Sequence, residues 1–224
     1  MSRSSERTGT AATVDRAIDA FARGQPVCIH DAADREGETD LVYPAAAVTP
    51  EAVARLRNDA GGLICVALSD AVATAFELPF LQEALDHPLA ADHELGYDER
   101  SSFSLTVNHR ETHTGITDED RALTIRELGS AASAPDEVDF AGTFRAPGHV
   151  HLLRAADGLL ADRQGHTELG IALAEAAGVA PAVVVCEMLD DETGHALAPE
   201  DAAAYAARHG IPYVEGADLL DRLA

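Results

Sequence analysis

The chain of 224 residues contains no lysine and no tryptophan, so all 16 basic residues are arginine, against 39 acidic residues. The formal net charge of the chain is −23, and only 4% of its residues are aromatic. Such a surface is unsuited to duplex nucleic acid and to anionic membranes, because both bind basic side chains. Extreme acidity without lysine is typical of a surface adapted to high salt, where repulsion between carboxylates is screened. We therefore expect a cytoplasmic protein of a halophile.

Cysteine is also scarce, with three residues that each lie inside an apolar run: Cys28, Cys65 and Cys186. An odd number without paired spacing argues against a disulfide framework or a cysteine metal site, and predicts reduced, buried thiols. The first residues have no apolar core segment, and no hydrophobic run approaches the length of a membrane span. We expect neither a signal peptide nor a transmembrane helix.

Apolar residues make up 46% of the chain, which is enough for a hydrophobic core. Internal repeats and a glycine-rich nucleotide fingerprint are absent, and no linker separates two halves. Periodicity and turn residues predict strands at 26–29, 41–44, 63–68, 103–107, 149–153, 182–188 and 211–214. They predict helices at 14–23, 50–59, 118–128, 167–177, 199–208 and 217–223, and another between Ser69 and Pro79. Residues 81–101 and 130–147 show no periodicity.

This interleaving predicts a single α+β domain over residues 13–224, with a mixed sheet and helices packed around it. Residues 1–12 are rich in serine, threonine and arginine, and we expect them to form a disordered tail.

An acidic stretch from Asp34 to Asp40 separates the first two predicted strands. In an extended chain Glu36, Glu38 and Asp40 point to the same side, where their carboxylates repel one another. They stay ionised together only if water separates them or a cation lies among them, either Arg35 or a divalent metal. Oxygen ligands favour Mg²⁺ or Mn²⁺. The alternative is a solvated acidic turn, which is the commoner outcome in so acidic a protein.

A second polar stretch, Arg163 to Glu168, lies where a loop leads into a predicted helix. The N–H groups and dipole at a helix N-terminus attract an anion. Arg163 can add a bidentate contact to a phosphate and the Thr167 hydroxyl another, while His166 can bind a metal. Ordinary helix capping beside a surface arginine is the alternative.

Two further residues stand at the ends of predicted strands. His149 follows a Pro-Gly turn and shares a strand face with His151. It is a candidate catalyst, and the alternative is a hydrogen-bonded structural role. Glu187 ends a valine-rich run, where a carboxylate is costly unless paired, and is a candidate general base. A solvent-facing strand end is the alternative for Glu187. The simplest prediction for Cys65 is a residue of the hydrophobic core.

Five stretches occur in an order and spacing that resemble one enzyme family: Asp34-Arg35-Glu36-x-Glu38-x-Asp40, Thr114-Gly115-Ile116-Thr117 with Asp120-Arg121, Arg145-x-Pro147-Gly148-His149, Gly165-His166-Thr167-Glu168 and Cys186-Glu187. The family is 3,4-dihydroxy-2-butanone 4-phosphate synthase, of riboflavin biosynthesis, and the resemblance spans about residues 13–220. It implies a lyase dependent on Mg²⁺ or Mn²⁺ that converts D-ribulose 5-phosphate to L-3,4-dihydroxybutan-2-one 4-phosphate and formate. The implied route is a metal-stabilised enediol followed by a rearrangement of the carbon skeleton.

The resemblance also implies a role for each matching residue. Glu36 and His166 would bind the metal, and His149 and Glu187 would be catalytic. Substrate would be held by Arg35, Glu36, Asp40, Arg163, Gln164, Gly165, His166, Thr167 and Glu187. Four more positions would line the site: Asp31, Glu38, Cys65 and Thr114. Family members are homodimers with the site near the subunit interface, so we expect the same here.

Longer members carry a GTP cyclohydrolase II domain after this one. This sequence ends before such a domain, so we expect a monofunctional synthase. We expect its source to be a halophilic archaeon. The sequence departs from the family pattern at Gln164, where many members have glycine, and at Ala32-Ala33, which replace a more acidic pair. Two other functions fit the residues: another metal-dependent sugar-phosphate isomerase or aldolase, and a non-catalytic protein that binds a phosphorylated metabolite or a metal. Release of formate separates the synthase from an isomerase.

Overall fold

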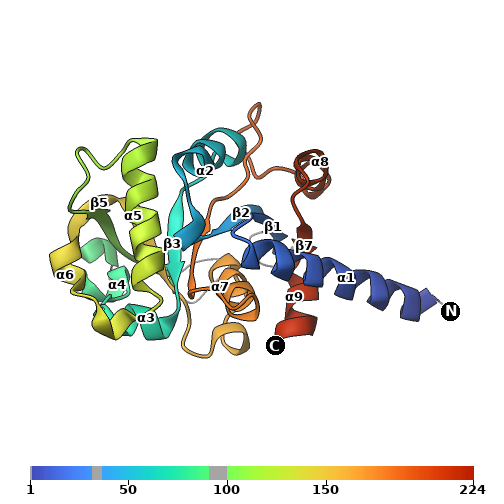
Figure 1. Ribbon diagram of the computed structural model, residues 1–224, viewed down its shortest axis with the longest axis horizontal. Helices are drawn as coiled ribbons and strands as arrows, with labels where there is room; N and C mark the ends of the chain where they lie inside the picture. Colours follow the sequence, from blue (N-terminus) through green and yellow to red (C-terminus); the bar gives the residue numbers. More distant parts are fainter. Residues whose placement is uncertain (1, 32–36, 91–99) are drawn as a thin grey trace.

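The computed structural model of the chain describes residues 2–31, 37–90 and 100–224, and only the backbone of residues 2–10. A seven-stranded sheet runs through it, with helices on both faces (Figure 1). The strand order is β4 (Phe103–His109), β5 (Phe144–Arg154), β3 (Cys65–Leu68), β6 (Ala182–Val185), β2 (Thr39–Pro44), β1 (Val27–His30) and β7 (Tyr213–Glu215). β3 pairs with β5, and β1 with β7, in parallel; the other neighbours are antiparallel. The predicted α+β fold with a mixed sheet is confirmed.

The central strands alternate their side chains between two hydrophobic cores, as a pleated strand requires. In β6, Val184 belongs to one core, and Val183 and Val185 belong to the other. The first core is covered by α2 (Pro50–Arg55), α5 (Asp118–Ala131) and α8 (Pro199–His209). The second is covered by α1 (Ser2–Ala22), α7 (His166–Ala176) and α9 (Gly216–Leu223). Complete burial of one valine or leucine stabilises the fold by about 1.5–3 kcal/mol, so these two cores fix where α7 lies on the sheet.

Shorter elements connect the layers. Three are α-helices: α3 (Asp70–Ala75), α4 (Leu81–Ala84) and α6 (Phe140–Thr143). Four are 3₁₀-helices: η1 (Ala45–Ala47), η3 (Pro88–Ala90), η4 (Pro135–Glu137) and η5 (Leu159–Ala161). A π-helical turn, η2 (Leu56–Ala60), continues α2.

The predicted helix starts agree with the structure where a side chain caps the helix. Thr49, Ser69 and Thr117 each accept a hydrogen bond from the backbone N–H three residues ahead, which satisfies an N–H that has no partner inside the helix. All three cysteines are reduced and buried, as expected. Within the described ranges, no helix has the length and apolar character needed to cross a bilayer.

Several predicted boundaries differ from the structure. α5 continues through Gly129 to Ala131 because this glycine packs against the backbone of η1, where a Cβ would lie 2.7 Å from the carbonyl carbon of Ala45. Residues 130–147 contain η4, α6 and the first part of β5. Within the aperiodic segment 81–101, α4 and η3 form, and residues 91–99 lie outside the described part.

α1 begins at Ser2 in place of Val14, and its first turns project from the body of the molecule (Figure 1). The sequence from Ser2 to Ala12 contains no proline, the strongest helix breaker, so the helix can extend backwards through Gly9. The disorder expected for residues 1–12 in solution stays a prediction.

Candidate active site

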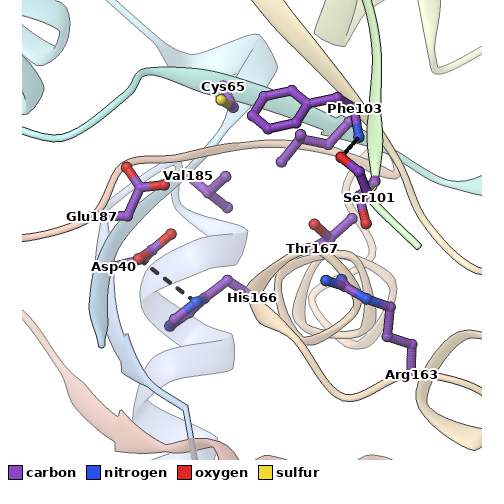
Figure 2. A pocket seen from close by; sticks show the side chains of 11 residues that line it. Asp40, Cys65, Ser101, Phe103, Arg163, His166, Thr167, Val185 and Glu187 are labelled. Carbon is purple, nitrogen blue, oxygen red and sulfur yellow. Dashed lines mark hydrogen bonds and ion pairs between the residues drawn. The ribbon is translucent and has the colours of Figure 1, made fainter. Parts of the chain in front are cut away.

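A pocket opens where the N-terminal end of α7 faces the sheet, and we call it the α7 pocket. Its walls are formed by five strands (β2, β3, β4, β5 and β6), by the segments just before β4 and just after β6, and by the loop before α7. The lining residues are Asp40, Cys65, Ser101, Ser102, Phe103, Leu153, Arg163, His166, Thr167, Val185 and Glu187. Figure 2 shows Asp40, His166 and Glu187 on one side of this pocket and Arg163, Ser101 and Phe103 on the other. The pocket is therefore acidic at one end and cationic at the other.

The cationic end is built by the start of α7. Gly165 is the N-cap of this helix, so the N–H groups of its first turn and the hydroxyl of Thr167 lie beside the pocket. The Arg163 guanidinium donates to Glu168 Oε2 at 2.7 Å, and Glu168 is completely buried. The other oxygen of Glu168 accepts from the backbone N–H of Ala156 at 3.0 Å. Glu168 therefore fixes Arg163 at the pocket wall, in an arrangement suited to a phosphate group.

The acidic end is centred on His166, which is buried. Its Nε2 lies 3.2 Å from the carbonyl oxygen of Ile29, and because a carbonyl only accepts, Nε2 is the donor. Its Nδ1 lies 3.7 Å from Asp40 Oδ1. In the neutral ring the lone pair is then on Nδ1, on the side of Asp40. A histidine that binds a metal commonly donates its other N–H to a backbone carbonyl in this way.

Glu187 follows β6 and forms an isolated antiparallel bridge with Asp40, so the two acidic residues are neighbours on adjacent strands. Its Oε2 accepts a hydrogen bond of 2.8 Å from the backbone N–H of Leu63. Gly62 lets the backbone come this close: a Cβ there would overlap the Glu187 carboxylate and lie 2.6 Å from its carbonyl oxygen. Glu187 therefore has a fixed orientation at the end of a buried strand.

The thiol of Cys65 lines the pocket between these groups. Burial raises its pKa well above the ordinary value, and the negative charges of Glu187 and Asp40 raise it further. Cys65 is therefore a neutral thiol in this site, and the structure gives it no features of a nucleophile.

His149 and Thr114 do not line the α7 pocket. His149 is exposed on β5, and its backbone N–H and its Nδ1 both contact the side-chain amide of Asn108, at 2.8 and 3.1 Å. Thr114 lies in an exposed turn, where its N–H donates to Asp120 at 3.1 Å. The chain therefore gathers Asp40, His166 and Glu187 in one place, and leaves His149 outside it.

Comparison with known proteins identifies the family. The family model for 3,4-dihydroxy-2-butanone 4-phosphate synthase matches residues 15–222. The chain belongs to this family. The synthase of Archaeoglobus fulgidus is 50% identical over 219 residues, which cover 92% of this chain and 92% of the relative. That of Methanosarcina acetivorans is 47% identical over 221 residues, 93% of this chain and 90% of the relative.

Solved structures of the synthase family share this fold. A crystal structure of 3,4-dihydroxy-2-butanone 4-phosphate synthase in complex with two magnesium ions matches with a TM-score of 0.80 and 32% sequence identity. The match covers 93% of this chain and 95% of that one. The family predicted from the five sequence stretches is thus confirmed, and so is its α+β fold.

Several residues that the synthase family pattern assigned to the site either do not line the α7 pocket or fall outside the described part of the chain. Arg35 and Glu36 are outside the described residues. Asp31 is buried at the end of β1, where its side chain accepts from the Glu38 N–H at 3.1 Å, so Asp31 and Glu38 close the base of the loop that carries them. In the loop before α7, Gln164 and Gly165 do not line the pocket; the Gln164 amide donates to the carbonyl of Leu160 at 3.5 Å.

The metal that the synthase family implies fits the donor atoms of the acidic end. His166 has its Nε2 committed to a carbonyl, and the carboxylates of Asp40 and Glu187 line the same side of the pocket. Across the three described stretches, no cluster of three or more histidine, cysteine or acidic residues could hold a metal by itself. A ligand set of His166 and Glu36 would draw on a residue outside those stretches.

Sequence reasoning gave no role to Glu168, which holds Arg163 at the pocket wall, or to Asn108, which contacts His149. Glu168 closes the Gly-His-Thr-Glu stretch, and its position two residues after His166 was the available signal. Asn108 gave no signal at all, because its contact with His149 depends on how β4 and β5 are aligned.

Proposed function

We propose that this protein is a 3,4-dihydroxy-2-butanone 4-phosphate synthase, which converts D-ribulose 5-phosphate to L-3,4-dihydroxybutan-2-one 4-phosphate and formate. The two products together contain every atom of the substrate, so no co-reactant is needed. Mg²⁺ is the proposed cofactor and Mn²⁺ the alternative, and we infer a cytoplasmic location.

The observation that carries this proposal is the polarity of the α7 pocket. Arg163, Thr167 and the N-terminal end of α7 suit the phosphate of a sugar phosphate. Asp40, His166 and Glu187 stand on the opposite side, where the ketone and hydroxyl groups of the same molecule would lie (Figure 2). The α7 pocket therefore offers a phosphate site and candidate acid–base groups to the two ends of one molecule.

The reaction begins by removing a proton from the carbon beside the ketone, which produces an enediol. Glu187 is the proposed base, because its second oxygen is anchored by the Leu63 N–H and its position at the end of β6 faces the pocket. Asp40 and His166 would orient the substrate hydroxyl groups, with Arg163 and Thr167 holding the phosphate. His149 completes the proposed catalytic set.

His166 and Glu36 are the proposed metal ligands, and Nδ1 of His166 lies 3.7 Å from the Asp40 carboxylate. When bound, a divalent cation supplies positive charge that stabilises the negative charge developing on the substrate oxygens. The sparse protein ligand set agrees with the preference of Mg²⁺ for sites that keep several water or substrate oxygens.

The direct test is incubation with ribulose 5-phosphate and Mg²⁺ in molar salt, with formate measured by a formate dehydrogenase assay. We expect formate and the four-carbon product in equal amounts, and a loss of about 10²–10⁴-fold in the variant Glu187→Gln. Conversion to another five-carbon sugar phosphate without formate would indicate an isomerase instead. Binding without turnover would indicate the non-catalytic alternative.

We also propose that the protein is a homodimer in which His149 serves the α7 pocket of the partner subunit. His149 is exposed outside the pocket of its own chain. Three exposed apolar side chains lie near the proposed site residues: Leu63, whose backbone N–H contacts Glu187, Phe103 at the pocket, and Ile116, two residues after Thr114. Exposed apolar residues that cluster around functional groups favour a covering partner.

Mixing two inactive variants tests this arrangement. In a dimer with shared sites, His149→Ala and Glu187→Gln chains can combine so that one of the two pockets has both residues intact. After unfolding and refolding together in equal amounts, about a quarter of the parental activity should return, since half the dimers are mixed and each has one intact site. If every site is built within one chain, or if the protein elutes as a monomer, the mixture stays inactive.

A further inference from the structure

Both side-chain hydrogen bonds that the structure gives Asn108 go to a single residue, His149. Asn108 is buried on β4, with 3% of its surface exposed. The backbone N–H of His149 donates to its Oδ1 at 2.8 Å, and its Nδ2 lies 3.1 Å from Nδ1 of the imidazole. One amide group thus holds both the backbone and the ring of the proposed catalytic histidine.

The direction of both hydrogen bonds follows from chemistry alone. A backbone N–H can only donate, so the amide atom that faces it must be the oxygen. The atom that faces the imidazole is then the NH₂ group, which can only donate. Nδ1 of His149 must therefore accept, and in the neutral ring the hydrogen is on Nε2.

The surrounding backbone keeps Asn108 in this orientation. Gly115, with φ +90°, packs against the side-chain amide of Asn108. A Cβ on Gly115 would lie 2.5 Å from Cγ and 2.6 Å from Oδ1 of Asn108. Asp120 holds that turn, because its carboxylate accepts from the N–H groups of Gly115 at 2.8 Å and Thr114 at 3.1 Å. Gly148 lets the backbone of β5 approach β4 beside Asn108.

We propose that Asn108 is a positioning residue that fixes His149 as the Nε2–H tautomer, so that His149 presents a hydrogen-bond donor to a substrate oxygen. Because the amide NH₂ donates to it, Nδ1 keeps the role of acceptor. A neutral imidazole that donates to a carbonyl oxygen is suited to enediol chemistry, since it stabilises developing negative charge without taking the proton. This role rests on the proposed function, but the tautomer itself does not.

The variant Asn108→Asp tests the assignment with almost no change of shape. One carboxylate oxygen still accepts from the His149 N–H, while the other now accepts where the amide donated. Nδ1 must then carry a hydrogen, and the ring either changes tautomer or becomes charged. We expect kcat to fall about 10²-fold with KM little changed, and the pH dependence of kcat to shift, because a positioned donor is lost. Asn58→Asp, at the only other asparagine, is the matched control and should match the parent.

¹⁵N NMR of protein labelled in histidine reads the tautomer without any turnover, and His149→Gln assigns the signals. We expect a protonated Nε2 and an unprotonated Nδ1 in the parent, and a protonated Nδ1 in Asn108→Asp. A protonated Nδ1 in the parent, or an Asn108→Asp variant with parental kcat and pH profile, would overturn the proposal. Absence of formate from the parent would instead refute the proposed function, and the NMR result would still decide the tautomer.

Discussion

Glu168 has no solvent exposure, and its charge is balanced by Arg163 alone among the contacts that the structure gives it. A buried carboxylate is costly to desolvate, and the cost is recovered only while its cation stays in place. The pair thus links the packing of α7 to the position of the guanidinium that would hold a phosphate.

Replacing Glu168 with glutamine should separate these two effects. The amide can still accept from the Ala156 N–H, but its NH₂ would face the Arg163 guanidinium. We expect the free energy of unfolding to fall by about 3 kcal/mol, and KM for ribulose 5-phosphate to rise more than kcat falls. Urea unfolding and steady-state kinetics measure both. Glu175→Gln, on the exposed side of the same helix, is the control; equal effects from the two variants would contradict this account.

Gly62 affects the other end of the pocket. Its backbone has no need of a positive φ, so an alanine there is excluded only by the space that Glu187 occupies. We expect Gly62→Ala to lower kcat by about 10²-fold by displacing the proposed base.

Gly129→Ala is the control, because its Cβ would also overlap backbone atoms, those of η1, but Gly129 does not line the pocket. This control should lose stability and keep its kcat at temperatures where it is folded. Loss of kcat in both variants would mean that the effect is structural only.

At the scale of the elements, the sequence predicted most of the helices and strands because capping residues and apolar runs carry the information locally. Thr117 is an example: its hydroxyl caps α5, which begins at Asp118 as predicted. Gly129 is the counter-example, since a glycine that usually ends a helix is here required by the close approach of η1. The pairing of Asn108 with His149 could not be predicted, because it depends on a register shift between β4 and β5.

The turn before α5 is a second case in which one side chain organises an element. Asp120 accepts backbone hydrogen bonds from the turn, which lower its pKa from the ordinary value; the Gly115 N–H is the largest cause, and partial desolvation opposes it. A carboxyl with a depressed folded-state pKa contributes stability above its unfolded pKa of about 3.9, and that contribution is lost as pH falls through the folded value.

Asp120→Asn should therefore be less stable than the parent by a constant amount above about pH 5, and the difference should shrink below about pH 4. Urea unfolding of both proteins across this pH range measures it. Glu119→Gln, the neighbouring acidic residue, should show no such dependence. A difference that stays constant down to pH 2 would mean that the charge of Asp120 does not hold the turn.

At the scale of the whole molecule, the dominant feature is the net charge of −23. An anionic substrate must approach through this field, and the pocket offsets it with Arg163 and the N-terminal end of α7. Salt weakens the field, since the screening length falls from about 10 Å at 0.1 M to about 3 Å at 1 M. The same screening relieves repulsion among the surface carboxylates, so stability and substrate capture should both rise with salt.

We expect the melting temperature to fall when NaCl is lowered from 2 M to 0.1 M, and each 1 kcal/mol of lost stability would lower it by about 2–4 °C for a chain of this size. Differential scanning fluorimetry at a series of salt concentrations measures the slope of melting temperature against NaCl concentration.

The triple variant Glu111→Gln, Glu175→Gln and Glu192→Gln reduces the net charge to −20 at exposed positions, so its melting temperature should depend less steeply on salt. None of the three positions lines the α7 pocket. A slope equal to that of the parent would mean that carboxylate repulsion does not set the salt dependence. A melting temperature that does not change on desalting would remove the case for adaptation to high salt altogether.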